Sequence, residues 1–231
     1  MNKLDPRNIY DDLHQIPELG FEEFKTSAYL ADKLEAMGYK VTRNIGGTGV
    51  IGEIKGSEPG PVMMLRADMD ALPFLIDGEK KNIHACGHDA HSAMLLAAAS
   101  ELVGKVKRGT LRILFQQGEE TLKGALAVID AGVIEDVDIA LGLHIRPVQD
   151  IAYGEMSPAV RHASSTFVNV VINGLSSHGA RPHLGVNAIE AAAVAINAIT
   201  AIKINPIIPW SCKVTGIKGC LLYTSPSPRD A

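Results

Sequence analysis

The sequence predicts an α/β domain with a mainly parallel sheet, followed by the start of a second, smaller domain. Two observations carry this prediction. Short apolar or β-branched segments alternate with longer segments of helical period, which is typical of layered α/β domains. Near Pro158 the sequence pattern changes, and a new strand–helix–strand pattern begins. We therefore expect one domain over residues 1–157 and part of another over residues 158–219.

Two helices are predicted before the first strand. Asp5-Pro6 marks the start of one, because proline fits the first helical turn, and this helix extends to about Gln15. The other covers residues 22–37, where apolar residues recur at helical spacing, and Gly38 follows as its C-terminal cap. Strands are expected over residues 39–43, 49–54 and 62–66, with a loop over residues 74–82.

The alternation continues through the rest of the chain. Residues 89–103 and 124–131 have helical length and pattern, whereas residues 111–115 and 139–143 are short apolar strands. Beyond Pro158 we expect a strand over 166–172, a helix over 186–202 and a strand over 213–217. Residues 220–231 have no periodicity and contain Ser-Pro-Ser-Pro, so they are expected to be a non-native or disordered tail.

Composition excludes several classes of function. The 231 residues include 22 Lys and Arg against 26 Asp and Glu, a net charge of −4, which does not favour nucleic-acid binding. No apolar run reaches the roughly 18 residues of a membrane span, and the N-terminus lacks the apolar stretch of a secretory signal. Three cysteines do not build a disulfide framework. We expect a cytoplasmic protein without membrane or nucleic-acid partners.

The most informative segment is His-Ala-Cys-Gly-His-Asp-Ala-His, residues 84–91. Thiolate and imidazole are ligands that zinc-like metals prefer. Cys86 and His88 are two residues apart, a spacing that puts both side chains on one side of an extended loop. Asp89 is placed to orient these ligands. A plain polar loop with a helix cap at Asp89 is the alternative, but the density of donors favours a metal site.

Further acids and a histidine follow predicted strands. Glu119 and Glu120 come after strand 111–115; a cation could bind one carboxylate and leave the other as a general base. A solvated acidic turn is the alternative. His144 ends strand 139–143, and Asp68 and Asp70 follow strand 62–66. Taken alone, His144 is better explained as a hydrogen-bonded histidine of the core. However, ligand-binding sites in parallel sheets lie at the carboxyl ends of strands.

Six motifs in one order resemble a known family. It comprises the metal-dependent amidohydrolases that include hippurate hydrolase, N-acyl-amino-acid amidohydrolases, N-acetyldiaminopimelate deacetylase and the plant auxin-conjugate hydrolases. The resemblance covers about residues 4–217, and the string His-Ala-Cys-Gly-His-Asp is highly specific. The motifs occupy residues 14–23, 65–73, 84–91, 117–120, 142–144 and 177–183.

The resemblance implies a zinc-peptidase-like α/β catalytic domain with an inserted α+β lid, through which a homodimer forms. It further implies two divalent metal ions (Zn, Mn, Co or Ni) and hydrolysis of the amide bond of small N-acyl amino acids. Carried over by motif, Cys86, His88, Glu120 and His144 are metal ligands, Glu119 is the general base, Asp70 is the supporting acid, and His178 steadies the oxyanion.

One departure leaves three hypotheses open. In the family the chain continues, completes the lid and supplies another metal-binding histidine, whereas nothing after Ile217 matches. We therefore expect a truncated chain with an incomplete lid. The leading hypothesis is an amidohydrolase, and the second is an inactive fragment of one. A third is a cysteine hydrolase that uses Cys86 with His88 or His144, which leaves the acidic motifs unexplained.

Overall fold

The computed structural model describes residues 4–158, 166–208 and 210–219. They pack as two compact units, one ending at Glu155 and the other beginning at Met156. The expected tail over residues 220–231 lies outside the described residues. None of the helices in the described ranges is long and apolar enough to cross a lipid bilayer.

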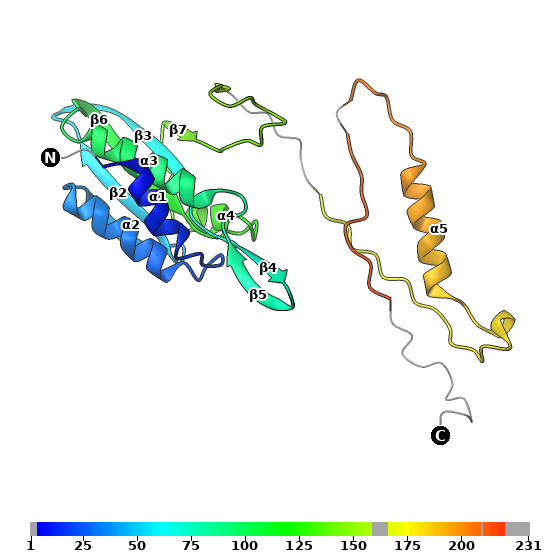
Figure 1. The fold of residues 1–231 in the computed structure, drawn as a ribbon. Coiled ribbons are helices and arrows are strands. Elements are labelled where there is room, and N and C mark those ends of the chain that lie inside the picture. Colours follow the sequence, from blue (N-terminus) through cyan, green and yellow to red (C-terminus); the bar gives the residue numbers. More distant parts are fainter. Residues whose placement is uncertain (1–3, 159–165, 209, 220–231) are drawn as a thin grey trace. The chain divides into compact units, whose positions relative to one another are not determined.

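A five-stranded sheet forms the centre of the first unit (Figure 1). Strand β3 lies between β6 and β7 and is parallel to both, whereas β2 is antiparallel to β1 and β6. Four of these five strands therefore point the same way, and the predicted α/β class with a mostly parallel sheet is confirmed. In spatial order they are β1 (Lys40–Ile45), β2 (Gly49–Lys55), β6 (Arg108–Gln116), β3 (Glu58–Asp68) and β7 (Ile139–Gly142).

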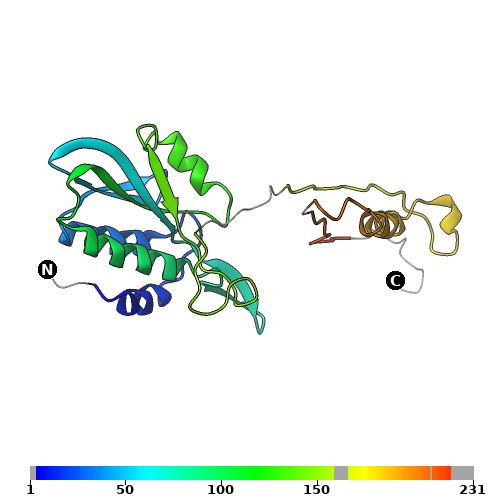
Figure 2. The ribbon, with the colours of Figure 1, turned by 90° about the horizontal axis from the view of Figure 1, so that it is seen from above.

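Helices cover both faces of this sheet (Figure 2). The predicted helix start at Asp5-Pro6 is confirmed, because the Asp5 side chain accepts a hydrogen bond from the Arg7 N–H. Gly38 follows the second helix with a φ of +87°, as a C-terminal cap requires. Helices α1 (Pro6–His14), α2 (Phe24–Ala36) and α3 (His88–Leu102) lie on one face, and α4 (Gly124–Asp130) lies on the other.

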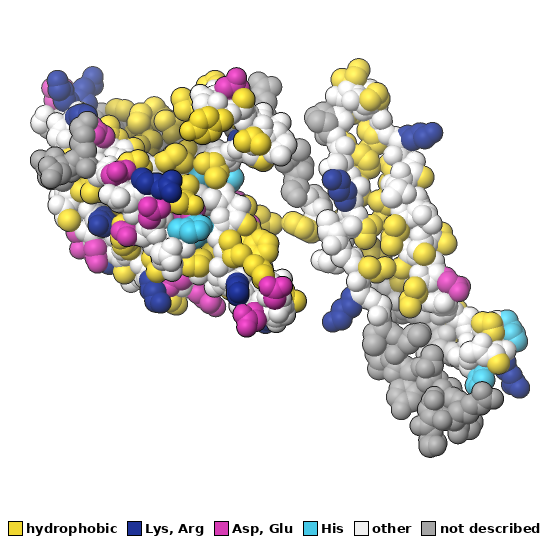
Figure 3. Space-filling view, viewed as in Figure 1, with side chains coloured by type: hydrophobic (Ala, Val, Ile, Leu, Met, Phe, Trp, Pro, Cys, Tyr) yellow, Lys and Arg dark blue, Asp and Glu magenta, His cyan; other side chains and the backbone are white. Residues whose placement is uncertain are grey.

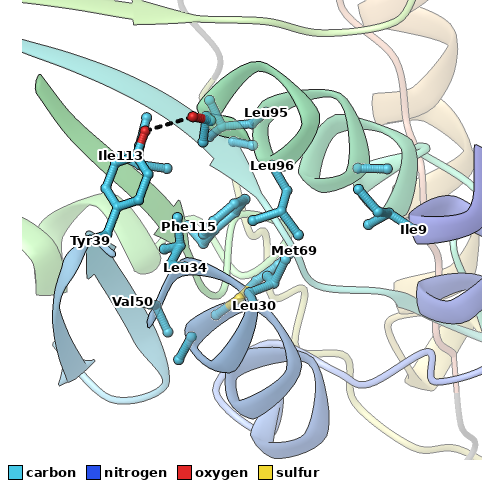
Figure 4. Packing of buried hydrophobic residues seen from close by; sticks show 14 of the residues in the cluster. Ile9, Leu30, Leu34, Tyr39, Val50, Met69, Leu95, Leu96, Ile113 and Phe115 are labelled. Carbon is cyan, nitrogen blue, oxygen red and sulfur yellow. Dashed lines mark hydrogen bonds between the residues drawn. The ribbon is translucent and has the colours of Figure 1, made fainter. Parts of the chain in front are cut away.

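Two apolar clusters hold these layers together. Side chains alternate along β6, so Ile113 and Phe115 pack toward α2 and α3, whereas Leu114 packs on the opposite face beside Val128 of α4. Figure 4 shows the larger cluster, in which the Tyr39 hydroxyl donates to the Ala99 carbonyl over 2.9 Å. This packing fixes the position of α3, whose first residue is the histidine of the predicted metal motif.

Residues 74–82 are not a loop, which corrects the sequence prediction. They belong to a hairpin of β4 (Leu72–Ile76) and β5 (Glu79–Ile83), which projects from the rest of the unit (Figure 1). Asp77 and Gly78 form its two-residue turn, with φ angles of 53° and 81°. Both angles are positive, as the common hairpin turn of this length requires.

The second unit contains a short 3-10 helix, η1 (Pro182–Leu184), and the helix α5 (Ala188–Thr200). The predicted helix is confirmed: it starts where the Asn187 side chain accepts hydrogen bonds from the Ile189 and Glu190 N–H groups. None of the described residues of this unit is buried. Many of its apolar side chains are therefore exposed (Figure 3).

The strands predicted over residues 166–172 and 213–217 are wrong. Both segments are exposed except for the half-buried Ile172, and both lie outside any ladder of the described residues, although an isolated bridge joins Leu175 to Val186. Their β-branched residues favour extended backbone, but a strand also needs a neighbouring backbone with which to pair.

Candidate metal centre

The candidate site lies at the carboxyl ends of three parallel strands. In the sheet register, Asp68 of β3 lies beside Gln116 of β6, and Arg66 lies beside Gly142 of β7. The segments that follow these strands carry Asp70, the Glu119–Glu120 pair and His144. Because the strands are parallel, their ends meet at one edge of the sheet. The convergence expected from the sequence is therefore present.

Asp70 connects the start of α3 to the acidic turn. His88 Nδ1 lies 3.0 Å from Asp70 Oδ1, and both side chains are fully buried. The other oxygen of Asp70 accepts the Glu120 N–H over 2.9 Å. Since an ionised carboxylate only accepts hydrogen bonds, His88 carries its proton on Nδ1. Its Nε2 lone pair therefore faces the acidic turn, as a metal-binding imidazole requires.

Two buried polar atoms of the site are unpartnered. His88 Nε2 and Glu120 Oε1 are 3.9 Å apart, and neither has a hydrogen-bond partner among the described residues. Ligand atoms of Cys86, His88 and Glu120 all lie within 4.8 Å of one another. An unsatisfied buried polar atom costs about 1–3 kcal/mol. A divalent cation would satisfy all three donors, and thiolate, imidazole and carboxylate are donors that zinc takes. The residues present fit a metal ion.

Gly87 gives the Cys86–His88 segment its shape. It has a φ of +81°, a left-handed conformation that side-chain-bearing residues rarely adopt. The backbone turn there places the Cys86 thiol and the His88 imidazole close to each other and to Glu120. A Cβ atom at Gly87 would also clash with Cδ1 of Ile145, so only a glycine leaves room for the segment that carries His144.

Cys86 is held in its neutral thiol form by its surroundings. Burial, together with a hydrogen bond to Glu120 and the negative charges of Glu119 and Asp68, raises the pKa of Cys86 to about 12. Cysteine nucleophiles need the opposite environment, one that lowers the pKa of the thiol. The site therefore argues against a cysteine hydrolase and is consistent with a thiol that ionises when a cation binds.

Glu119 is the carboxylate left over beside the three donors. Its Oε2 lies 4.0 Å from His88 Nε2, and its side chain is 39% exposed. Burial raises the pKa of Glu119, and repulsion from Asp68 and Glu120 adds to this, whereas a protonated His88 would lower it. A carboxylate with a raised pKa next to the donors is placed to accept a proton from water.

A second group of donors contains residues that the sequence analysis did not assign. Ligand atoms of Asp68, His88, His91 and His144 also lie within 4.8 Å of one another. The His144 ring centroid is 4.4 Å from that of His91 and 6.0 Å from that of His88. The three-residue spacing of His88 and His91 at a helix start was the available signal, because it places both rings on one helix face.

Glu23 is a further buried group that the sequence analysis did not assign. Its side chain is fully buried and accepts the Gly118 N–H over 2.8 Å and the Thr48 hydroxyl over 2.5 Å. Burial raises the pKa of Glu23, although these two hydrogen bonds oppose the shift. Because Gly118 immediately precedes Glu119, Glu23 helps to fix the acidic turn.

His178 belongs to the second unit, whereas the donors described so far belong to the first. Its Nδ1 accepts the Ala180 N–H over 3.1 Å, which stabilises the local turn. Its role at an oxyanion therefore stays a prediction.

The fold and the donor set together define a class of protein. It is an α/β protein with a candidate metal centre, and a spare carboxylate beside it, at the carboxyl ends of its parallel strands. Comparison with known families identifies it further: the chain belongs to peptidase family M20/M25/M40, which matches residues 64–215.

Two named relatives are a little over one third identical to this chain. Thermostable carboxypeptidase 1 of Saccharolobus solfataricus is 37% identical over 220 residues, 89% of this chain and 56% of that protein. Hippurate hydrolase of Campylobacter jejuni is 36% identical over 218 residues, 90% of this chain and 57% of that protein. The chain thus spans a little over half the length of these relatives.

A solved structure of the family agrees with the fold. The Bacillus subtilis YXEP protein, described as a dinuclear metal-binding peptidase of the M20 family, is 37% identical with a TM-score of 0.55. The match covers 62% of this chain and 42% of that one.

Proposed function

We propose that this chain carries the metal-binding and proton-transfer groups for hydrolysis of N-acyl amino acids of the N-acetyl or N-benzoyl type. Cys86, His88, Glu120 and His144 would hold divalent ions, two in number, of Zn, Mn, Co or Ni. The observation that carries the proposal is the buried, unpartnered pair of His88 Nε2 and Glu120 Oε1 beside Cys86, with Glu119 next to them.

Each residue is proposed to supply one chemical role in amide hydrolysis. When bound, a divalent cation lowers the pKa of a coordinated water to about 7 and polarises the substrate carbonyl. Glu119 accepts a proton from water and delivers it to the leaving amine. Asp70 holds His88 in the tautomer that leaves Nε2 open. His178 is proposed to donate to the developing oxyanion, a contact that contributes about 3 kcal/mol in other enzymes.

The substrate class rests on the names of relatives. One is a hippurate hydrolase, and hippurate is an N-benzoyl amino acid. Another is a carboxypeptidase, so cleavage of peptides is the neighbouring alternative. Both names describe hydrolysis of an amide bond whose amine belongs to an amino acid.

Amino-acid release from N-acetyl and N-benzoyl amino acids tests this function. The purified chain is stripped with a chelator and reloaded with each metal, and we expect turnover only in the loaded protein. Glu119→Gln should keep the metal but lose about 10²- to 10⁴-fold in rate, because the general base is gone. Glu135→Gln makes the same change at an exposed position and should leave the rate unchanged.

Other outcomes favour the other hypotheses. Metal uptake without turnover would support a non-catalytic metal-binding chain. Turnover that resists the chelator but not a thiol alkylator would support a cysteine hydrolase and overturn the proposal. Retention of the rate in Glu119→Gln would remove Glu119 from the role of base.

We also propose that residues 1–157 are the catalytic part and residues 158–219 a lid through which two copies associate. The exposed apolar side chains of the second unit support this, including Val168, Val171 and Val194 at 78%, 82% and 69% exposure. Sedimentation velocity at micromolar concentration should give a dimer, and Val194→Asp should shift it toward the monomer. A monomeric wild-type chain would contradict this part of the proposal.

A further inference from the structure

We propose that Asp68 and His91 are positioning residues that fix the place of His144, and that neither of them donates to the metal. This inference rests on the metal centre proposed above. It separates the four residues whose ligand atoms lie within 4.8 Å into two functional pairs.

Every hydrogen-bonding atom of the His91 ring is already used. Its side chain is fully buried, and Nδ1 lies 2.6 Å from Asp68 Oδ1. Its Nε2 lies 2.9 Å from the backbone nitrogen of Ile145. A backbone N–H only donates, so His91 Nε2 must be the acceptor and Nδ1 must carry the proton. The lone pair that a metal would need is therefore engaged by Ile145.

Asp68 is engaged on both of its oxygens as well. Oδ1 accepts from His91, and Oδ2 accepts from Arg66 Nη1 over 2.7 Å. Arg66 is itself held, since its Nε donates to Gln116 Oε1 over 3.0 Å. The result is a continuous series of hydrogen bonds from the ends of β3 and β6 through His91 to Ile145.

Ile145 links His91 to His144 through its backbone N–H and carbonyl groups. Its N–H donates to His91, its side chain packs against Gly87, and its carbonyl oxygen lies 2.6 Å from His144 Nδ1. A carbonyl only accepts, so His144 carries its proton on Nδ1 and its Nε2 is left for a metal. His144 lies beyond the end of β7, so these contacts replace the support of a strand.

Of the four residues, His88 and His144 thus keep an imidazole nitrogen open. The His91 ring is committed to Asp68 and the Ile145 N–H, and the Asp68 carboxylate to His91 and Arg66. Loss of outer partners of metal ligands typically weakens metal binding by about 10- to 100-fold.

Asp68→Asn is the sharpest single change. Arg66 should keep the amide oxygen, so the NH₂ group would face His91 Nδ1 and force the His91 proton onto Nε2. That proton would then oppose the Ile145 N–H, and the contact would break. We expect zinc affinity, measured by competition with a chromophoric chelator, to fall by about 10- to 100-fold. We also expect the visible spectrum of the Co²⁺-loaded chain to show altered ligand geometry.

Asp136→Asn is the matched control. Asp136 also pairs with an arginine, Arg112, but contacts none of the four residues of this group. Zinc affinity and the Co²⁺ spectrum should be unchanged in this variant. His91→Gln, which keeps an acceptor for Ile145, should lose less affinity than His91→Ala, and this rescue separates positioning from general damage to the fold.

A double-mutant cycle with His144→Ala decides how the pair acts. If Asp68 and His91 work through His144, then His91→Gln should cost no further zinc affinity once His144 is alanine. An additive loss, or a drop in bound metal per chain on His91→Gln alone, would identify His91 as a donor and overturn the inference.

A readout without metal separates this inference from the proposed function. Nitrogen chemical shifts of the metal-free wild-type chain should show His91 as the Nδ1–H tautomer, and this signal should vanish in His91→Gln. An Nε2–H tautomer would overturn the inference even if the chain binds metal. Failure of the wild-type chain to bind Zn²⁺ or Co²⁺ would overturn both proposals, whereas binding that Asp68→Asn leaves unchanged would overturn only this one.

Discussion

The chemistry of Cys86 would change if a cation bound beside it. Among carboxylates and partly buried, Cys86 has its pKa raised to about 12, so it is a neutral thiol near pH 7. A cation in reach of Cys86, His88 and Glu120 would offset the charges that hold the proton in place. The thiol is therefore better suited to bind metal than to attack a substrate.

Cys86→Ala should accordingly lower zinc affinity by at least about tenfold, since losing a direct donor costs at least as much as losing an outer partner. Cys212→Ala is the matched control, because Cys212 is an exposed cysteine of the second unit. Metal content after dialysis, measured by elemental analysis, checks both variants. Equal metal content in Cys86→Ala and wild type would reject Cys86 as a ligand.

Residue types and the family resemblance suggested candidate donors, but not the hydrogen bonds that support them. Cys86, His88 and Glu120 were expected together and do lie within 4.8 Å of one another. Glu23 and His91 were not assigned, because their importance comes from backbone N–H groups of Gly118 and Ile145, which are distant in sequence. A sequence shows its donors, whereas the acceptors that each donor meets depend on the tertiary fold.

At the scale of elements, Tyr39 ties the start of β1 to helix α3. Its hydroxyl is buried against the Ala99 carbonyl, and burial raises the pKa of Tyr39 to about 12. In the unfolded chain tyrosine ionises near pH 10. The stability that depends on the neutral hydroxyl is therefore complete below pH 10 and is lost as the pH rises from 10 toward 12.

Tyr39→Phe should therefore weaken this alkaline loss of stability, while costing about 1 kcal/mol at pH 7 for the missing hydrogen bond. Urea unfolding at pH 7 and at pH 11 measures both effects. Tyr153→Phe, at a side chain that is 99% exposed, should reproduce the wild-type pH dependence. A pH dependence equally steep in Tyr39→Phe and wild type would contradict the assignment.

The elements themselves were predictable where pattern and burial agree. Strand β6 alternates its buried side chains between two helical layers. The apolar run over residues 111–115 predicted this strand. The β4–β5 hairpin was missed because β5 is rich in exposed lysine, although Asp77-Gly78 is a strong turn signal. The strands expected over 166–172 and 213–217 failed because composition alone does not supply a pairing partner.

For the whole molecule, burial is distributed unequally between the two units. All the buried residues of the described chain lie in the first unit, including both apolar clusters. Cys86, His88, Glu119, Glu120 and His144 lie there too. The first unit thus contains both the core and the candidate centre.

A chain that ends at Glu155 should therefore fold cooperatively and bind zinc. We expect its thermal midpoint within about 4 °C of the full chain, corresponding to a change of roughly 1 kcal/mol. A chain that ends at Ala131 is the control, because it lacks β7 and His144 and should lose zinc affinity. Circular dichroism and chelator competition check both, and a non-cooperative 1–155 chain would contradict the expectation.

Fold class was predictable at this scale because alternating strands and helices leave few arrangements open. The meeting of separate motifs at one sheet edge followed from the same alternation, since parallel strands end together. The alternation does not predict the arrangement of the second unit, where many apolar side chains of the described residues are exposed.

The β4–β5 hairpin begins just after Asp70 and ends just before His84, so both ends of the hairpin adjoin segments that carry residues of the candidate centre. We expect that its tip can be lengthened, shortened or labelled without moving any donor as long as Leu72 stays paired with Ile83. The exposed turn at Asp77 and Gly78 is therefore a suitable position for attaching a fluorophore while the donors of the candidate centre stay untouched.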